Sequence, residues 1–404
     1  MEGRDFLAEL AEDRGGDALR RWVDGTREAA LDPAQPIIDP HHHLWDRRPR
    51  PELGEGQRTH LRYLADDLME DTRGGGHNVF DTVFVECLSM YREDAADSHR
   101  AVGETEFVQG VAAVAASGIY GEGVRACGGI VSFADLTQGA SVSELLNAHI
   151  AAGANFRGIR HAHGWHASPD IRNSHHPTRD IEGLLGTPGF REGFAELGKL
   201  GLSFDCWGYH TQLSEVVDLA RAFPGVTIVL NHCGGPMAIG PYAGQRETTV
   251  WEAWLAGVTE VASYPNVVVK VGGCGMPTYG FGFENGDSAP GSDTLAAAWR
   301  PYFERLIELF GPSRCMFESN FPVERDCVSY RTLLNMFKKL AAKAQRLTRR
   351  RDLGPRTSVD DFHAHAGTRK ASPVVTRFSC LSCKHEKREL EKAWCMTQVM
   401  PRWD

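Results

Sequence analysis

Two histidines spaced two residues apart follow a short apolar run near the start of the chain. The run leads into Asp39, and His41 and His43 come directly after Pro40. Alternate side chains of a β-strand share a face, so the two imidazoles would enter one pocket while His42 points away. Neutral imidazoles on one face suit a divalent metal, or they hold a substrate anion or carbonyl. The alternative is a polar loop with a chance run of histidines, but the apolar flank favours a strand.

Polar residues that could do chemistry recur after other apolar runs of the chain. A single histidine beside an apolar run is more often a satisfied core residue than a ligand. Here seven of eight such runs end in titratable or polar side chains, which predicts one site built from many strand ends. After the first run these residues are Glu86, Arg160, His161, His163, Trp207, Tyr209, His210, Asn231, His232, Lys270, Glu318, Ser319 and Asn320.

The apolar runs have the length and composition of buried strands. Several are β-branched and nearly continuous in apolar character, as expected for strands covered on both faces. We predict strands at Ile37–His43, Val79–Cys87, Ala126–Phe133, Phe156–His163, Leu202–Tyr209, Val226–His232, Asn266–Gly272 and Arg314–Phe321.

Helical patterns lie between many of these strands, and Gly or Pro follows most of them within a few residues. The last pattern, from Tyr330 to Leu340, has apolar residues at helical spacing. We predict the other helices at Val142–Ala152, Phe190–Leu200, Leu213–Phe223, Val250–Ala262 and Thr294–Phe310.

Eight strands that alternate with helices or long loops over about 300 residues predict a (β/α)8 TIM barrel. The rival is an open doubly wound sheet, but no Gly-x-Gly-x-x-Gly follows an early strand and no P-loop is present. In a barrel the carboxyl ends of the strands meet at one mouth, where the polar residues named above would converge.

Five segments give the chain a resemblance to a known enzyme group. They are Ile38–Asp46, Gly158–His161, Ile171–His175, Leu230–Pro236 and Met316–Val323. At these residues the chain resembles the amidohydrolase superfamily, and within it the amidohydrolase-related (amidohydrolase 2) group of lactonase-like, metal-dependent hydrolases. That group includes sugar-lactone and pyrone-dicarboxylate lactonases and metal-dependent decarboxylases. The resemblance covers about residues 31 to 341 and implies a TIM-barrel fold.

The resemblance also implies roles for particular residues. By position, His41, His43 and His210 are metal or carbonyl ligands, and His232 is the sixth-strand acid or base. The eighth-strand position, an Asp in most of the superfamily, is Asn320 here. An amide accepts no proton at neutral pH and is a weaker ligand, so His232 or the neighbouring Glu318 would act as base. One divalent metal ion, Zn²⁺ or Mn²⁺, is implied, held weakly or not at all.

We expect hydrolysis of an ester-like bond, that of a sugar-acid or dicarboxylate lactone. Water attacks the carbonyl, and a metal or cationic side chains steady the oxyanion. His232 moves the proton, with Asn320 and Glu318 beside it. An anionic or polyhydroxylated substrate would contact a second set of residues, which are Arg160, Glu86, Trp207, Tyr209 and Lys270.

Several alternatives stay open at this stage. Arg160 could form only a structural ion pair with Glu86, and Lys270 could only balance acidic neighbours. A metal-dependent non-oxidative decarboxylase of the same superfamily is the enzymatic rival, and a catalytically degenerate binding barrel is the other. Among the clustered histidines we expect at most one with a function; they are His161, His163, His166, His175 and His176.

Composition restricts the class of protein, its partners and its location. The chain has 404 residues, 42% hydrophobic and 24% charged, with a net charge of −9, as in an ordinary soluble globular protein. An acidic body argues against nucleic acid as a partner. Neither a signal peptide nor a membrane span is recognisable, which predicts a cytoplasmic protein without membrane contact.

Ten scattered cysteines favour buried, reduced thiols. The sequence does not decide the oligomeric state, and a homo-oligomer is one alternative.

The chain ends differ from its body. We predict an N-terminal helical extension over 1–35, the barrel over 36–341, and an atypical basic tail over 342–404. The tail has few periodic apolar residues, which predicts disorder. We interpret it as a mis-spliced, frameshifted or read-through end. Cys380-x-x-Cys383 with His385 and Cys395 is an alternative zinc site, but the second pair lacks the usual spacing.

Overall fold

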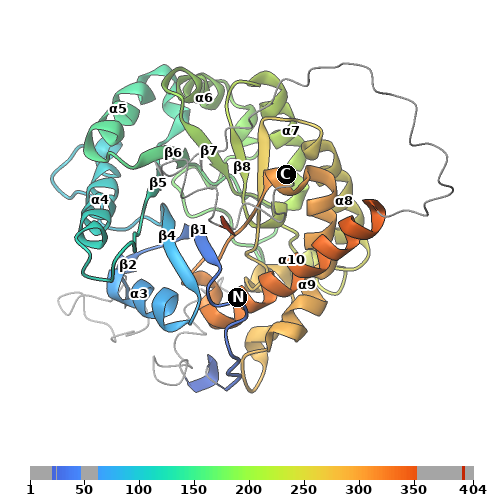
Figure 1. Cartoon of the computed structure of the whole chain (residues 1–404). Helices are drawn as coiled ribbons and strands as arrows, with labels where there is room; N and C mark the ends of the chain where they lie inside the picture. The colour runs from blue at the N-terminus through green and yellow to red at the C-terminus, as the bar shows by residue number, and fades with distance from the viewer. Residues whose placement is uncertain (1–20, 24, 47–61, 353–393, 396–404) are drawn as a thin grey trace, which may run out of the picture.

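A barrel of parallel strands, surrounded by helices, forms the body of the protein (Figure 1). The computed structural model describes residues 21–23, 25–46, 62–352 and 394–395. Eight strands make up the barrel wall: β1 Pro36–His42, β4 Asn78–Val85, β5 Gly129–Ser132, β6 Phe156–Arg160, β7 Ser203–Cys206, β8 Ile228–Leu230, β9 Val267–Val271 and β10 Cys315–Phe317.

The strands are neighbours in chain order, from β1 through β4 to β10, and every pairing between them is parallel. The barrel closes between its first and last strands through a parallel bridge from His42 to Phe321 and a hydrogen bond from the His43 amide to the Phe321 carbonyl (2.7 Å). A short strand, β11 (Trp394–Cys395), pairs with β1 at Ile37 and Ile38. Two further strands, β2 (Trp45–Asp46) and β3 (Arg62–Tyr63), form an antiparallel pair beside the barrel.

The predicted (β/α)8 barrel is therefore confirmed, and the strands deviate from prediction mainly at their carboxyl ends. Five of the eight predictions ran two or more residues too far, as at β6, which ends at Arg160 rather than His163. The reason is physical: past this point the polar residues leave the hydrogen-bond ladder and turn into the barrel mouth. The β-branched run of β9, Val-Val-Val-Lys-Val, is buried at every position, as expected for a strand covered on both faces.

Helices cover the outside of the barrel (Figure 1). The predicted helix Val142–Ala152 is confirmed in full, and α6 shows why such helices end where they do. Its first residue is Pro188, and the left-handed Gly201 (φ 66°) ends it. The longer helices are α3 Ala65–Gly74, α4 Val102–Ala116, α5 Val142–Ala152, α6 Pro188–Leu200, α7 Leu213–Ala222, α8 Thr249–Ala262, α9 Ser292–Phe310 and α10 Tyr330–Asp352.

The hydrophobic core lies between the barrel wall and this ring of helices. Its largest fully buried side chains include Trp254, Trp299 and Phe303, which come from α8 and α9. The seven cysteines of residues 62–352 are all buried and free, as predicted for reduced thiols. None of the helices described is long and apolar enough to span a bilayer.

The predicted end regions are described only in part. Trp22 of the N-terminal extension packs on Ala289 and donates to the Gly286 carbonyl (2.7 Å), which ties that segment to the barrel domain. Residues 342–352, placed by prediction in the tail, continue helix α10 as a stretch without Gly or Pro. Most of the predicted disordered tail, with its Cys-x-x-Cys, lies outside the described residues.

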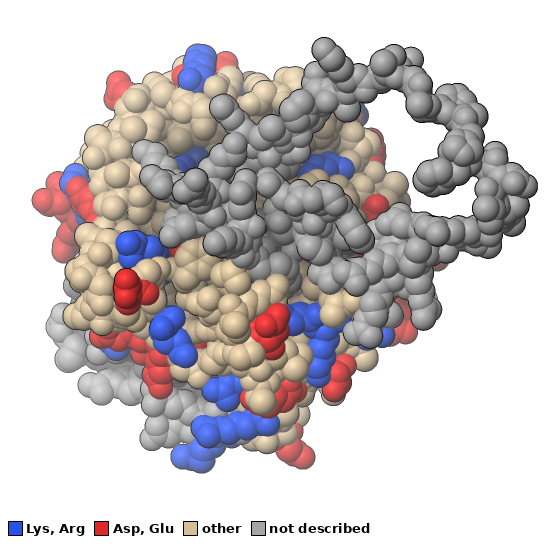
Figure 2. Space-filling view, in the orientation of Figure 1, with Lys and Arg blue, Asp and Glu red and all other residues tan. Residues whose placement is uncertain are grey.

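Lys and Arg are interspersed with Asp and Glu on the face that Figure 2 shows. Exposed ion pairs of the protein include Arg305 with Glu308 and Arg221 with Asp218. Exposed pairs of this kind stabilise a fold by about 0–1 kcal/mol each. The charges that matter for chemistry are therefore the buried ones inside the barrel.

Candidate active site

The His41 and His43 rings lie next to each other at the end of β1, as the two-residue spacing predicted. Both are buried, and their ring centroids lie 5.0 Å apart. His42 faces the other way, where its Nε2 lies 2.9 Å from the Thr82 hydroxyl. Burial, and then the nearby Lys270, hold the pKa of His41 well below its ordinary value, so this ring is neutral.

Glu318 joins His41 to His232, which comes from the end of β8. Its Oε1 accepts hydrogen bonds from His232 Nδ1 (2.7 Å) and from the His232 backbone amide (3.0 Å). Its Oε2 lies 2.6 Å from His41 Nδ1. That oxygen nevertheless has no hydrogen-bond partner of good geometry among the described residues, although it is buried. Three strand ends, those of β1, β8 and β10, thus meet at one carboxylate; we call His41, His232 and Glu318 the Glu318 cluster.

Two buried cations flank His41. The Arg160 guanidinium, at the end of β6, lies 3.4 Å from His41 Nε2, and the Lys270 ammonium on β9 lies 3.4 Å from His41 Nδ1. Each cation has its own carboxylate. Arg160 Nε donates to Glu86 at 2.6 Å, and Lys270 donates to Asp205 at 2.6 Å. Arg160 and Lys270 therefore do pair with acidic neighbours, which was the alternative left open for them. Both also contact His41.

Glu86, at the end of β4, is the hub of a second cluster. Besides Arg160 it contacts His175 Nε2 (3.1 Å) and His176 Nε2 (3.2 Å). Burial alone would raise the pKa of Glu86, but Arg160 and then the two imidazoles outweigh it and lower this pKa well below its usual range. His176 Nδ1 accepts from the Ala162 amide (3.1 Å), so its Nε2 carries the proton that faces Glu86. We call Glu86, Arg160, His175 and His176 the Glu86 cluster.

Asn320 follows β10 and lies beside His43. Its side-chain amide is 3.3 Å from His43 Nε2 on one side and 3.4 Å from Glu324 on the other. Its backbone amide donates to the His41 carbonyl (2.9 Å). Asn320 and His232 both have left-handed backbone conformations, with φ of 54° and 51°. Non-glycine residues adopt this region at a cost and concentrate at functional sites.

The fifth-strand residues lie apart from the Glu318 cluster. His210 begins a short 3₁₀ turn four residues after β7, where its Nδ1 accepts from the Met237 amide (3.3 Å). Its ring packs against Tyr242, and burial lowers its pKa to about 4. Trp207 and Tyr209 pack against each other, and the Tyr209 hydroxyl donates to the Arg172 carbonyl. The structure therefore does not bring His210 together with His41 and His43 through any contact described here.

A cavity of about 470 Å³ lies beside the Glu86 cluster, under the segment that follows β6. His175 belongs to both, since it lines the cavity and contacts Glu86. Two arginines, Arg172 and Arg179, also line the cavity, together with one carboxylate, Asp180. The cavity is thus connected to His41 through three contacts: His175 to Glu86, Glu86 to Arg160, and Arg160 to His41.

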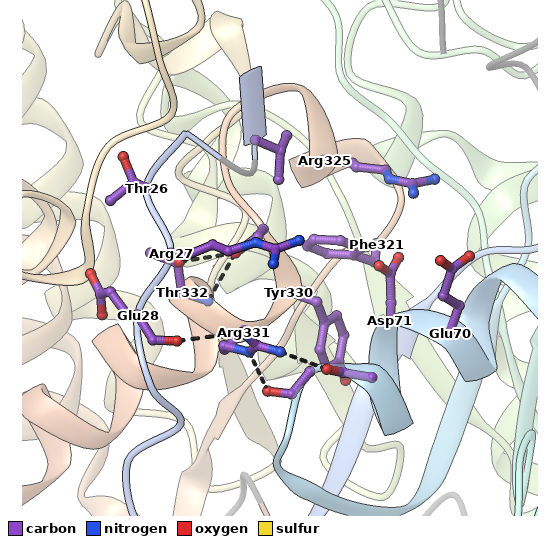
Figure 3. Close-up of a pocket in the computed structure, with 14 residues that line it drawn as sticks. Thr26, Arg27, Glu28, Glu70, Asp71, Phe321, Arg325, Tyr330, Arg331 and Thr332 are labelled. Atoms are coloured by element: carbon purple, nitrogen blue, oxygen red, sulfur yellow. Dashed lines mark hydrogen bonds between the residues drawn. The ribbon is translucent and has the colours of Figure 1, made fainter. Parts of the chain in front are cut away.

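A second cavity, of about 270 Å³, has a structural role (Figure 3). It lies between the N-terminal segment, α3 and the start of α10. Arg331 points across it and donates to the carbonyls of Gly74 and Gly75 (both 2.7 Å). Tyr330 in its wall donates to buried Asp39 (2.9 Å), which in turn accepts from the Ser319 amide (3.1 Å). Through Tyr330 and Asp39, the wall of this cavity therefore holds the strand end that carries Glu318. None of the clustered histidines lines the cavity.

Two groups of side chains in the described part have the geometry to hold a metal ion. They are His41, His232 and Glu318, and Glu86, His175 and His176; in each group the ligating atoms lie within 4.8 Å of one another. Neither group is the His41, His43 and His210 set expected from the resemblance. Sequence reasoning missed Asp205, Glu324, and the pairing of His175 and His176 with Glu86. Only Glu324 had a signal, its spacing of four residues from Asn320.

Known proteins place the chain in context. The sequence model of the family described as "Amidohydrolase" matches residues 38–351. The chain is 33% identical over 315 residues to the uncharacterised protein y4mH of Sinorhizobium fredii, which covers 75% of this chain and 91% of that protein. It is 30% identical over 124 residues to an L-fucono-1,5-lactonase of Burkholderia ambifaria, but this match spans only 31% of the chain and 36% of the lactonase.

Among solved structures, the fold resembles that of an amidohydrolase from Burkholderia multivorans crystallised with bound zinc. The TM-score is 0.52 at 22% identity, covering 76% of this chain and 91% of that structure. Another crystal form of the same amidohydrolase gives the same TM-score with 21% identity. At this level of identity the likeness supports the barrel fold.

Proposed function

The chain belongs to the amidohydrolase family, and from that premise we propose that it hydrolyses an ester-like C–O bond, that of a lactone. The observation that carries the proposal is the Glu318 cluster. A buried carboxylate accepts from His232 Nδ1 at 2.7 Å and lies 2.6 Å from His41 Nδ1. A carboxylate that fixes the tautomer of a histidine, whose other nitrogen is left to act as base, is a recurring arrangement in hydrolases.

His232 is the proposed general base. Because the Glu318 carboxylate can only accept, His232 Nδ1 carries a proton and the lone pair of a neutral ring lies on Nε2. That nitrogen takes a proton from the attacking water, and Glu318 stabilises the imidazolium that forms. The same proton then passes to the leaving alkoxide oxygen as the ring opens. Asn320 takes no part in proton transfer in this scheme, because an amide does not titrate near neutral pH.

Arg160 and Lys270 are the proposed oxyanion stabilisers. Both lie 3.4 Å from a nitrogen of His41 and are buried, so their charges act in a medium of low dielectric constant. Glu86 and Asp205 hold them in place, so little reorganisation is needed when negative charge develops on the carbonyl oxygen. This assignment keeps Arg160, Glu86 and Lys270 in the substrate-binding set predicted from the sequence, with Asp205 added.

The cavity beside the Glu86 cluster would hold the body of the substrate. Its volume of about 470 Å³ lies within the roughly 300–1,000 Å³ of ligand pockets. Arg172 and Arg179 line it and favour an anionic or polyhydroxylated compound, because guanidinium groups bind carboxylates and hydroxyl oxygens through several N–H donors. Trp207 and Tyr209 stay in the proposal as residues that shape the neighbouring wall.

The Glu318 cluster also fits a divalent metal ion, though with weak affinity. The donors are suitable, since ligating atoms of two imidazoles and a carboxylate lie within 4.8 Å of one another, and Oε2 of that carboxylate has no hydrogen-bond partner among the described residues. Lys270 and Arg160, each 3.4 Å from a His41 nitrogen, would repel a second positive charge there. His41, His232 and Glu318 would hold the ion. When bound, it would polarise the carbonyl.

Turnover of a panel of sugar-acid and dicarboxylate lactones, with and without a chelator, tests the proposal. Ring opening that is abolished by His232→Gln and persists after chelation supports it. Activity only on carboxylic acids, with CO₂ release and a stoichiometric Zn²⁺ or Mn²⁺ content, would replace it with a decarboxylase. No turnover by the folded protein on lactones, esters or aromatic acids would instead favour a binding barrel.

A further inference from the structure

Leu88 is the side chain that the end of β4 contributes to the cavity of about 470 Å³ beside the Glu86 cluster. Of the described residues that line this cavity, Leu88 alone comes from outside the segment 166–180. It follows Glu86 by two residues in the sequence, and it is 40% exposed. An exposed leucine needs no explanation by itself, but the backbone of this one does.

The backbone of Leu88 has a left-handed conformation, with a φ of 61°. This region is costly for a bulky residue, whereas glycine or asparagine adopts it more easily. Such conformations persist only where the surrounding structure holds them, and they concentrate at functional sites. The leucine thus stands at a position that its own backbone disfavours, which indicates that its side chain has a use.

Glu104, in the first turn of α4, holds this conformation. Its Oε1 accepts from the backbone amides of Cys87 (3.0 Å) and Ser89 (2.8 Å), the two neighbours of Leu88. The Cys87 thiol also donates to the Leu44 carbonyl (3.3 Å). Glu104, Cys87 and Ser89 are all buried. The backbone on both sides of Leu88 is therefore fixed, while its side chain lines the cavity.

Leu88 is also the largest apolar surface that the described lining leaves for a ligand. Most of the other lining residues are polar or charged, and the remaining apolar ones are Ala167, Pro169 and Ile171. Ile171 is buried and packs against Tyr209 and Met237, away from any ligand. Ala167 and Pro169 have smaller side chains than leucine. A hydrocarbon group of a bound molecule would therefore find its main apolar contact at Leu88.

We propose that Leu88 is a specificity-determining residue which, held by Glu104, receives a hydrocarbon group of the substrate. The substrate class is then an amphipathic lactone, with oxygen substituents for the polar lining and one methyl or larger apolar substituent for Leu88. Contact with leucine removes the apolar group from water, whereas a hydroxyl group in its place would lose a water partner and gain none. The inference rests on the proposed function in that the cavity holds the body of the lactone.

Pairs of sugar-acid lactones test the proposal. The members of a pair differ only in their terminal group, which is methyl in one and hydroxymethyl in the other. One group in an apolar contact changes kcat/KM by about tenfold, so we expect the wild type to prefer the methyl compound by about that factor. Leu88→Asn tolerates the left-handed conformation but presents an amide, and the preference should fall to within about twofold.

Met90→Asn is the matched control. Met90 lies in the same loop, has a φ of 55° and is also 40% exposed, but it is not among the described residues that line the cavity. Its substitution should leave the preference of the wild type in place. Loss of the preference in both variants would contradict a specific role of Leu88, because it would show an effect of the whole loop.

Two substitutions of Glu104 test whether it holds Leu88 in place. Glu104→Gln keeps an oxygen acceptor for the two amides, and the oxygen it replaces has no hydrogen-bond partner among the described residues. We expect the preference to persist. Glu104→Leu removes the acceptor and should reduce the preference as Leu88→Asn does. An unchanged preference in folded Glu104→Leu would overturn the holding role, and if this variant does not fold, the Leu88 and Met90 variants still decide the specificity.

Binding of the reaction products separates this inference from the proposed function. Titration calorimetry with the two open-chain acids of a pair measures the same preference without turnover, because each acid keeps the terminal group of its lactone. A wild type that opens no lactone but binds the methyl acid more tightly, with the difference lost only in Leu88→Asn, would overturn the proposed function and support the role of Leu88. No difference between the members of any pair, in rate or in affinity, would overturn that role, while measurable ring opening would leave the proposed function in place.

Discussion

Two buried carboxylates only a few side chains apart have opposite surroundings. Glu86 is saturated: it contacts the Arg160 guanidinium and two imidazoles, at 2.6, 3.1 and 3.2 Å. Glu318 contacts two imidazoles and the His232 backbone amide, but no Lys or Arg ion pair is found for it among the described residues, where one of its buried oxygens also has no hydrogen-bond partner. His41 stands between the two clusters, in contact with Arg160 on one side and Glu318 on the other.

This difference indicates that Glu86 and Glu318 have different roles. A carboxylate paired with a guanidinium keeps its charge and fixes the elements that carry its partners, here β4, β6 and the segment that lines the larger cavity. A carboxylate that faces imidazoles rather than a guanidinium or ammonium is free to stabilise a proton or a metal ion when one arrives. Glu86 should therefore matter for stability and substrate placement, and Glu318 for the chemical step.

The largest effect should come from breaking the saturated cluster. Glu86→Gln removes the charge that balances Arg160 and leaves a buried guanidinium without its carboxylate. Breaking such a pair from one side costs about 3–5 kcal/mol. We expect the free energy of unfolding, measured by urea denaturation, to fall by about 3 kcal/mol. A fall below about 1 kcal/mol would mean that Glu86 is not the structural partner of Arg160.

Glu318→Gln should show the reverse behaviour. The amide cannot stabilise an imidazolium on His232, and the loss of such a group reduces catalysis by about 10²-fold or more. No cation is left unpaired, so the free energy of unfolding should change by no more than about 1 kcal/mol. Parallel kinetic and denaturation measurements on Glu318→Gln and Glu86→Gln would separate the two roles. A variant of Glu318 that lost stability but kept its kcat would reverse them.

The pH dependence of stability should distinguish Glu324 from Glu86. The folded protein keeps the Glu324 proton up to about pH 8, whereas the unfolded chain loses it near pH 4.5. The folded state then binds more protons between these values, so stability falls as pH rises, by at most about 1.4 kcal/mol per pH unit. Glu86, with its lowered pKa, contributes stability above pH 4.5 that is lost in acid.

Urea denaturation from well below pH 4 up to about pH 8 measures both contributions. Glu324→Gln should flatten the decline between pH 5 and 8, and Glu86→Gln should flatten the loss below pH 4.5. Glu104, whose pKa is also raised to about 8 by burial, should behave like Glu324. If the Glu324→Gln curve ran parallel to that of the wild type across this range, the buried neutral acid would be ruled out.

The smallest effect should come from removing metal. Two cations within 3.4 Å of His41 nitrogens weaken the Glu318 cluster as a metal site. We expect dialysis against a chelator to lower kcat/KM on lactones by less than about threefold. Loss of nearly all activity, restored by one equivalent of Zn²⁺, would contradict this expectation. It would show that the metal binds tightly despite the repulsion from Arg160 and Lys270.

Much of the architecture could be predicted from the sequence because local signals and tertiary packing agree. Helix Val142–Ala152 was predicted to the residue, since Gly153 ends an uninterrupted helical pattern. The barrel prediction followed from eight apolar runs that alternate with helical patterns or long loops. The carboxyl ends of strands were placed less well, because residues such as His161 are adjacent to an apolar strand yet leave its hydrogen-bond ladder.

The candidate site could be predicted only as a set of strand ends. Glu318, His41 and His232 were all named, and they lie together. His210 was expected with them by analogy, but β7 ends at Cys206 and a 3₁₀ turn takes the imidazole toward Tyr242. Glu324 and Asp205 were missed because no periodicity encodes which buried carboxyl faces an amide or an ammonium. Such pairings arise only when distant segments pack.

The most direct test of the account is the rate of lactone opening by the wild type and by His232→Gln in the same assay. The account predicts measurable ring opening by the wild type, and a kcat/KM at least 100-fold lower for the variant with an unchanged melting temperature. Equal rates for the two proteins would contradict it, because the imidazole held by Glu318 would then not be the base.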